Sequence, residues 1–282
     1  MSYYGGIEGG GTGSRMVILQ ENGAQLGFAE GPQTNYWHLG MDEAARRIVA
    51  LTENALRNAD LPLDTPLKSL GMALSGVNTE LNQIQITEAV RKTSPKIADR
   101  IYASNDAVGT LITATDESAI VLIAGTGSIC KLIRKDLSYI RIGGLGYLLG
   151  DEGSEANNGD SFCRQLFYDA GKHLGRHVLA AVRHADREGL MSSNGMDVVC
   201  CGSVFKSWNL LESGFRDGLK PERPGDFLHG RLKLRLLKTT AAIGAAIMAA
   251  KKECNVHLPR PDVISIPLCE IDLMEQDPQK GP

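Results

Sequence analysis

The sequence has no long hydrophobic run and no excess of charge of either sign. None of its apolar stretches approaches the roughly 20 residues that a membrane-spanning helix needs. With 33 acidic and 30 basic residues among 282, the net charge is near zero, so charge gives no reason to expect a nucleic acid or a membrane surface as partner. Residues 1–6 lack both a basic start and an apolar core, and we therefore expect no signal peptide.

Cysteines are few, and no two of them form a Cys-x-x-Cys pair. They are Cys130, Cys163, Cys200, Cys201, Cys254 and Cys269. This scatter lacks the spacing of common metal ligands, so we expect no metal bound directly by protein side chains. Several of the cysteines lie inside apolar segments, where buried thiols are common. Free thiols fit a reducing compartment, and we expect a cytoplasmic protein.

Three widespread glycine and serine motifs are also missing. No Gly-x-x-x-x-Gly-Lys run followed by Ser or Thr occurs, which argues against a P-loop NTPase. The glycines of residues 144–150 have one residue too many before the last glycine for a dinucleotide fingerprint. Ser75 has Ala73 where a nucleophile elbow requires glycine. Hydride transfer and serine hydrolysis are therefore disfavoured.

The pattern that is present is one of alternating strands and helices. Strands are predicted at 69–75 and 100–104, and helices at 41–59, 80–93, 160–188 and 239–252. This alternation favours an α/β fold, and the length favours two lobes. We expect an N-terminal lobe at 1–117, a C-terminal lobe at 118–258 and a weakly patterned tail at 259–282.

A strand, a glycine-rich bend and a returning strand occur twice. The bends lie at residues 9–14 and 125–127. Glycines let backbone N–H groups close on phosphate oxygens, and Thr126 and Ser128 add hydroxyl donors. A single bend of this kind is more often an ordinary turn. The repeat, however, predicts two turns that grip the phosphates of a nucleotide.

Polar residues at the ends of other strands complete the candidate site. Asp106 follows the strand at 100–104 and is a candidate general base. Asn35 lies in a loop suited to a polar pocket, whereas its neighbour Trp37 is more often a packing residue. Ser203 opens a helix after the strand at 197–201. This start is either a third ligand contact or a plain strand-helix connection.

Six motifs in order, over residues 5–252, resemble the eukaryotic N-acetylglucosamine kinases of the BadF/BadG/BcrA/BcrD group. They lie at 8–12, 34–37, 105–107, 125–128, 150–154 and 202–208. The resemblance implies the actin, hexokinase and Hsp70 superfold, with two ribonuclease-H-like lobes and a ligand cleft between them. It also implies ATP-dependent phosphorylation of the 6-hydroxyl of N-acetyl-D-glucosamine, an amino-sugar salvage reaction.

The resemblance further implies a role for each matched residue. Asp106 is the base that accepts the hydroxyl proton. ATP is expected to contact Thr12, Thr126, Gly127 and Ser128 through its phosphates, and Ser203 and Ser207 near its nucleoside. The sugar is expected to contact Asn35, Asp106, Gly144, Leu145, Gly146, Tyr147, Leu148 and Asp151. Mg²⁺ is expected to arrive with ATP, bridging phosphate oxygens mainly through waters, one of which Glu8 would orient.

The chain departs from the family pattern in two places. The loop that usually reads Gly-Gly-Trp-Gly-His has Leu145 and Tyr147 in place of the indole and the imidazole. A helical segment of some tens of residues normally follows Ser154 and is missing here, so we expect an incomplete and weakly stable second lobe.

Two alternatives to a working kinase therefore stay open. One is a non-catalytic or inactive shortened isoform that keeps the sugar and nucleotide motifs. The other is an ATPase activator of the same superfold that holds an iron–sulfur cluster, although the cysteine between glycines that it would need is not found. The sequence also leaves open whether two copies form a homodimer.

Overall fold

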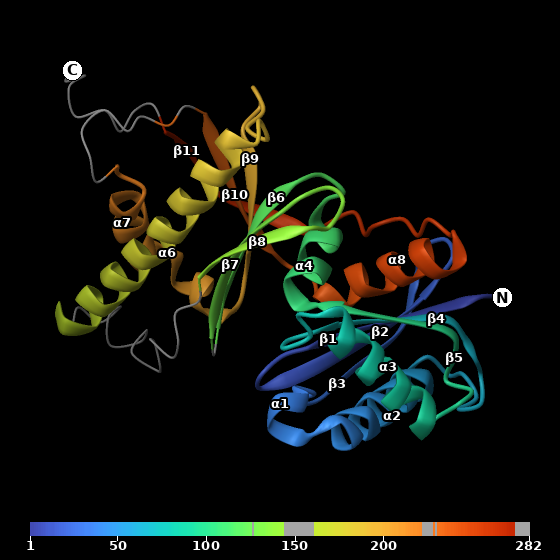
Figure 1. The fold of residues 1–282 in the computed structure, drawn as a ribbon. Coiled ribbons are helices and arrows are strands. Elements are labelled where there is room, and N and C mark those ends of the chain that lie inside the picture. Colours follow the sequence, from blue (N-terminus) through green and yellow to red (C-terminus); the bar gives the residue numbers. More distant parts are fainter. Residues whose placement is uncertain (126, 144–160, 222–227, 229, 274–282) are drawn as a thin grey trace. The chain divides into compact units, whose positions relative to one another are not determined.

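The computed structural model describes residues 1–125, 127–143, 161–221, 228 and 230–273. The chain forms two compact units (Figure 1). The first comprises Met1–Thr115 and Lys238–Ile264, and the second comprises Asp116–Leu237 and Ser265–Pro282. Each unit has its own sheet and its own hydrophobic core. The chain therefore passes from one unit to the other three times.

The first unit is built on a mixed sheet in the order β3-β2-β1-β4-β5. Its strands are β1 (Tyr3–Gly9), β2 (Gly13–Gln20), β3 (Gln25–Pro32), β4 (Leu67–Leu74) and β5 (Ala98–Asn105). β1, β2 and β3 form antiparallel hairpins, whereas β1, β4 and β5 run parallel. All parallel strands thus end at the same edge of the sheet.

Helices cover both faces of this sheet (Figure 1). On one face lie α2 (Met41–Asn58) and α3 (Glu80–Thr93), close to the short helix α1 (Tyr36–Leu39). α2, a helix that the sequence predicted at 41–59, buries Ala44, Ile48, Leu51 and Ala55, which lie on one helix face. On the other face lie α4 (Asp106–Ala114) and α8 (Ala241–Cys254).

Two glycines let α8 approach the sheet closely. Gly6 and Gly71 are register partners on β1 and β4. A Cβ atom at Gly6 would collide with the carbonyl of Ala242, and one at Gly71 would collide with the carbonyl of Ala245. Only glycine leaves room for the helix backbone at these two positions, so a larger residue at either would push α8 away from the sheet.

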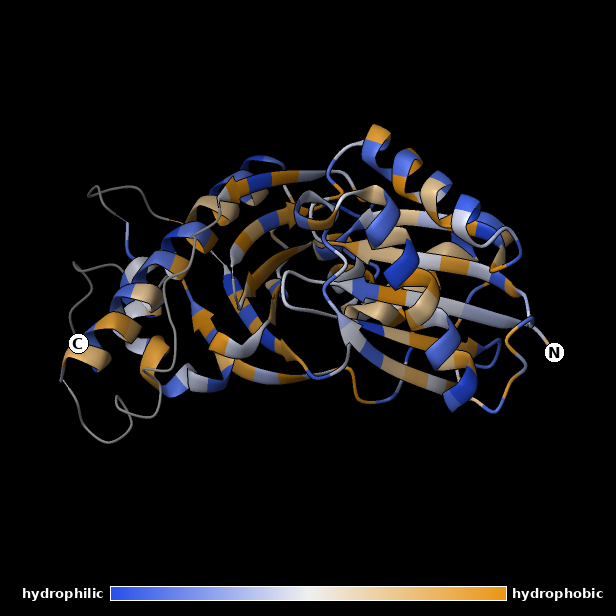
Figure 2. Cartoon of the chain, turned by 90° about the horizontal axis from the view of Figure 1, so that it is seen from below, coloured by the Kyte–Doolittle hydropathy of each residue, from blue (hydrophilic) through white to orange (hydrophobic). Residues whose placement is uncertain are grey.

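The second unit has a sheet in the order β11-β10-β9-β6-β7-β8. Its strands are β6 (Ala119–Ala124), β7 (Ser128–Ile133), β8 (Tyr139–Gly143), β9 (Met196–Cys201), β10 (Arg231–Leu237) and β11 (Ser265–Asp272). The 27-residue helix α6 (Ser161–Arg187) and α7 (Trp208–Gly218) pack on one face, preceded by the 3₁₀ helix η1 (Ser203–Ser207). Figure 2 shows helices of both units banded blue and orange, as expected of helices with one apolar face.

The division of the chain differs from the boundaries that we expected. Residues 238–258, placed in the C-terminal lobe, and residues 259–264, placed in the tail, belong to the first unit. Residues 265–272, placed in a weakly patterned tail at 259–282, form a strand that pairs with β10. Pro267 obscured this strand in the sequence. It is tolerated because β11 lies at the sheet edge, next to a register shift between Leu234 and Arg235.

Three further properties concern the described residues. None of the helices in the described ranges is long and apolar enough to cross a membrane. The six cysteines all lie in those ranges and all are free thiols. Burial raises the pKa of Cys130 to about 12, so this thiol is unreactive at neutral pH.

Candidate functional site

The parallel strands of the first unit bring two loops and the start of α4 to one sheet edge. Gly9 pairs with Leu74, and Leu74 pairs with Asn105, so these last residues of β1, β4 and β5 lie in line. Two strand spacings, about 10 Å, therefore separate the glycine turn after β1 from Asp106 after β5. The loop after β4, residues 75–79, lies between them.

The turn between β1 and β2 is an exposed glycine turn that carries Thr12. Its ends are joined by the N–H of Gly10, which donates to the carbonyl of Gly13 at 2.9 Å. Within the described ranges, no hydrogen bond uses the N–H of Gly11 or of Thr12, and the space beside Gly11 is open. Free N–H groups in an exposed turn are the donor set that a phosphate requires.

Asn35 is held next to this turn by its neighbour Thr34. Gly9 has no Cβ, and a Cβ there would collide with the buried Thr34 side chain, whose hydroxyl lies 2.9 Å from that of Ser14. Asn35 caps α1 by accepting from the N–H of Trp37 at 3.0 Å. Its amide nitrogen makes no hydrogen bond in the described part of the chain. A ligand hydroxyl could therefore accept from it.

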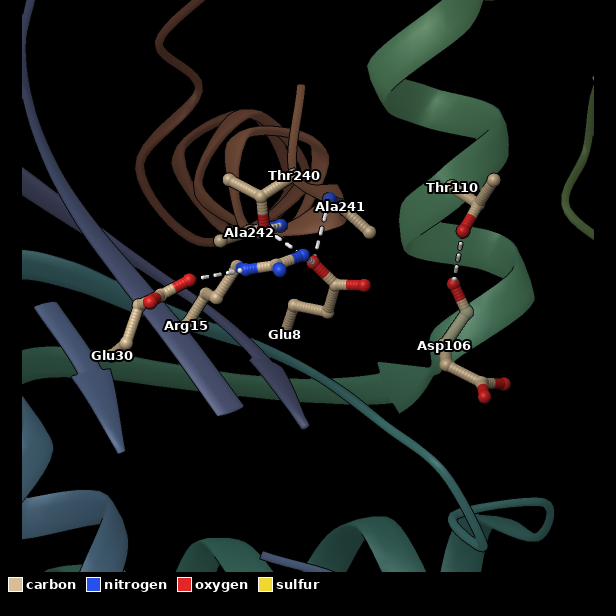
Figure 3. A network of polar contacts seen from close by, with 8 residues as sticks. All are labelled: Glu8, Arg15, Glu30, Asp106, Thr110, Thr240, Ala241 and Ala242. Atoms are coloured by element: carbon tan, nitrogen blue, oxygen red, sulfur yellow. Dashed lines mark hydrogen bonds and ion pairs between the residues drawn. The ribbon is translucent and has the colours of Figure 1, made fainter. Parts of the chain in front are cut away.

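Asp106 is the first residue of α4, where a carboxylate is favoured by the helix dipole. One of its carboxylate oxygens accepts from the N–H of Ala107 at 2.8 Å. Its carbonyl accepts from the Thr110 hydroxyl at 3.0 Å. Figure 3 shows the carboxylate turned away from Thr110 and from the body of α4. The carboxylate therefore lies at the sheet edge, outside the helix body.

Glu8 has structural partners that the sequence did not reveal (Figure 3). Its Oε2 accepts from the hydroxyl of Thr240 and from the N–H of Ala241, the latter at 3.2 Å. Arg15 lies 3.9 Å from the same oxygen and also pairs with Glu30 at 2.9 Å. Glu8 thus lies at the N-terminus of α8. A threonine before an alanine-rich helix is a recognisable cap signal, but nothing local pointed to Glu8 as its partner.

In the second unit, a hairpin turn meets the start of η1. Ala124 pairs with Ser128 across the hairpin, and the N–H of Gly125 donates to the carbonyl of Gly127 at 2.9 Å. Gly202 has φ +115° and lies so close to Ala124 that a Cβ would collide with the backbone there. β6 and β9 are parallel neighbours, so their carboxyl ends lie together.

The structure thus gathers the predicted residues into two groups, one in each unit. Thr12, Asn35 and Asp106 lie at one edge of the first sheet. Gly127 and Ser128 lie in the hairpin of the second sheet, with Ser203 beginning η1 beside it and Ser207 ending η1. Several predicted residues lie outside the described ranges, as does the junction after Ser154: Thr126, Gly144, Leu145, Gly146, Tyr147, Leu148 and Asp151.

The chain is similar to two curated sugar kinases. A glucosamine kinase of Vibrio cholerae is 33% identical over 168 residues, which are 59% of this chain and 55% of the relative. An N-acetyl-D-glucosamine kinase of Dictyostelium discoideum is 28% identical over 187 residues, 62% of this chain and 54% of the relative. The chain thus matches about half the length of these curated relatives.

Solved structures and a family model extend the comparison. A ROK hexokinase from Thermus thermophilus shares the fold, with a TM-score of 0.60, 16% identity and coverage of 90% of this chain and 99% of the other. This similarity confirms the predicted α/β fold of the actin and hexokinase type. The model of the BadF/BadG/BcrA/BcrD ATPase family matches residues 6–165. This match spans more than half of the chain, which therefore belongs to the BadF/BadG/BcrA/BcrD ATPase family.

Proposed function

We propose that the protein transfers a phosphoryl group from ATP to the 6-hydroxyl of N-acetyl-D-glucosamine, as an amino-sugar salvage enzyme. The observation that carries the proposal is the sheet edge of the first unit. There the glycine turn with Thr12, the amide of Asn35 and the carboxylate of Asp106 follow strands that end in line. The names of the two curated relatives support an amino sugar as the acceptor.

ATP is the proposed phosphoryl donor, as the family description supports. The free N–H groups at Gly11 and Thr12 fit a phosphate, and in the second unit Thr126, Gly127 and Ser128 are proposed to contact the phosphates as well. Ser203 and Ser207 are proposed to lie toward the nucleoside. Phosphoryl transfer depends mainly on positioning and on charge stabilisation, which such donors supply.

Mg²⁺ is proposed to reach the site on ATP, where it would neutralise charge on the phosphate oxygens. Among the described residues there is no group of three or more His, Cys, Asp or Glu side chains that could hold a metal ion. This ion commonly keeps several waters and binds through few protein ligands. Glu8 Oε1, which accepts no hydrogen bond within the described ranges, is available to orient one of those waters.

Asp106 is proposed to accept the proton of the sugar hydroxyl as the hydroxyl oxygen attacks phosphorus. Asn35 would donate to a sugar oxygen, and the remaining sugar contacts are proposed for residues 144–148 and Asp151. Leu145 and Tyr147 replace the family's usual Trp and His in this loop, so the sugar side loses an indole and an imidazole. The six free thiols support a reducing compartment such as the cytoplasm.

A shortened isoform without catalytic activity is the second candidate. It is favoured by the match to the family model, which ends at residue 165, shortly after the junction that follows Ser154. Such a protein would bind the sugar or ATP without transferring phosphate.

The test is a coupled assay for ADP release, with and without N-acetyl-D-glucosamine. Asp106→Asn is expected to lower kcat by about 10² to 10⁴ because a well-placed general base contributes that much. Sugar affinity should change little, since the amide keeps the size and much of the hydrogen bonding of the carboxylate.

Asp99→Asn is the matched control. Asp99 lies on β5, the strand that ends just before Asp106; its side chain is half exposed and forms an ion pair of 2.9 Å with Lys68. Its change should leave the rate intact. Full activity in the Asp106 variant would exclude this residue as the base. Sugar binding without any ADP release by the wild-type protein would favour the inactive isoform.

A further inference from the structure

A continuous set of hydrogen bonds joins the Asn35 loop to Asp106 within the first unit. It runs through the loop after β4, residues 75–79, which the sequence did not single out. Its centre is the carbonyl of Gly76, which accepts from the Tyr36 hydroxyl at 2.9 Å, the Trp37 indole at 3.3 Å and the Asn78 amide at 3.3 Å. Two donors from α1 and one from the loop after β4 therefore converge on one acceptor.

The position of Gly76 requires glycine. Its φ is +93°, and a Cβ there would lie 2.6 Å from the Trp37 ring and 3.3 Å from Asn35 Oδ1. The loop after β4 thus packs directly against the residues that hold Asn35. Burial raises the pKa of the Tyr36 hydroxyl, so this group remains a donor at neutral pH.

Asn78 connects this centre to the residue before Asp106. Its Oδ1 accepts from the amide of Asn105 at 2.8 Å. Asn105 is 4% exposed, and its own Oδ1 accepts from the N–H of Ala107 at 3.0 Å. The same N–H lies 2.8 Å from the Asp106 carboxylate. Both ends of the Asn105 amide are therefore engaged, which fixes its rotamer and the entry of the chain into α4.

We infer that Asn78 is a positioning residue for sugar phosphorylation, setting the Asn35 amide relative to the Asp106 carboxylate. The inference rests on the proposed function, because it assigns both groups to one sugar. Asn78 need not touch the substrate. Small displacements of a catalytic group can lower a rate strongly, so the residue that links the two loops should affect turnover more than folding.

The experiment is a double-mutant cycle on the full chain, read by ADP release with N-acetyl-D-glucosamine. Asn78→Ala removes the link from one side. Asn105→Thr removes it from the other side and keeps a side chain that caps a helix well. Each is expected to lower kcat/KM for the sugar about tenfold, the upper range for one hydrogen bond, with KM for ATP unchanged. Because both changes break the same bond, the double variant should lose little more than either single one.

The matched control is Asn58→Ala. Asn58 is likewise exposed and donates its amide to a backbone carbonyl, that of Phe28 at 2.7 Å, but it lies at the β3 edge of the same unit. Its change should leave kcat/KM intact.

Wild-type activity in Asn78→Ala, or losses that multiply fully in the double variant, would overturn the inference while the proposed function stands. A raised KM for ATP with an unchanged value for the sugar would also overturn it. Absence of phosphate transfer by the wild-type protein would overturn both proposals.

Discussion

At the scale of single residues, Glu8 shows how residues far away in the sequence can fix the position of a side chain through hydrogen bonds. Thr240 lies 232 positions away, yet its hydroxyl reaches the Glu8 carboxylate at the N-terminus of α8 (Figure 3). The Thr240 hydroxyl oxygen also accepts from the N–H of Ala242 at 3.1 Å and so caps the helix. Negative charge at a helix N-terminus is favourable. Cap and carboxylate together hold α8 on the end of β1.

Replacement of this cap should destabilise the first unit. Thr240→Val keeps the shape of the side chain and removes its hydroxyl. It is expected to lower the free energy of unfolding by about 1 kcal/mol, the usual value of an N-cap side chain. Urea unfolding followed by tryptophan emission measures the change. Thr239→Val, one position earlier and outside the cap, should cost far less, and equal losses would refute the assignment.

At the scale of elements, α6 and α7 pack through two glycines on each helix. Gly171 and Gly175 of α6 lie against the backbone of Leu211 and Phe215 of α7. Gly214 and Gly218 of α7 in turn lie against the backbone of α6. The spacing of four residues puts each pair on one helix face. The two helices therefore approach more closely than larger side chains would permit.

A single methyl group should disturb this contact. Alanine in place of glycine normally stabilises a helix by up to about 1 kcal/mol. In Gly214→Ala the added methyl would collide with the carbonyl of Tyr168. Overpacking of this kind costs about 1–3 kcal/mol, so the net effect should be a loss. Thermal unfolding measures it, with Ser213→Ala on the exposed side of α7 as the control. If Gly214→Ala stabilised the protein as Ser213→Ala does, close contact between α6 and α7 would contribute nothing to the free energy of unfolding.

The elements also show which parts of the fold were predictable from sequence. The helix expected at 80–93 occurs at those positions, because its cap at Thr79 and its periodicity are local signals. The strand β11 was missed because Pro267 disguises it, and its pairing with β10 is not local. At the site, the glycine turn and Asp106 were singled out from the sequence because each follows a predicted strand. Asn78 was missed because an asparagine after Gly76 looks like any turn residue.

At the scale of the whole molecule, the second unit depends on a strand that comes last in the described chain. After β10 the chain leaves for the first unit, and it returns only at Ser265. β11 then covers one side of β10 and buries Ile271, while Leu273 beyond it is also buried. The second unit therefore cannot complete its sheet without this returning segment.

A chain ending at Ile264 should accordingly have a weakened second unit. Loss of Ile271 and Leu273 from the core removes about 3–6 kcal/mol of burial, at 1.5–3 kcal/mol for each side chain. It also leaves β10, still paired with β9, as an exposed edge strand prone to association. Trp208 reports on the second unit and Trp37 on the first, so single-tryptophan variants can follow each unit during urea unfolding.

The Trp208 transition should move to lower urea and the Trp37 transition should stay. A chain ending at Leu273 keeps the whole strand and is the control. Unchanged transitions in the shorter chain would show that β11 contributes little to the unit.

The glycine-lined face beneath α8 has a consequence for synthesis of the protein. Residues 1–115 leave the ribosome first, but the helix that covers Gly6 and Gly71 follows only after the whole of 116–237 has been made. Domains commonly fold in the order of translation. Until then the part of this face that α8 covers, around Gly6 and Gly71, is exposed, and a chaperone that shields apolar surface could bind there.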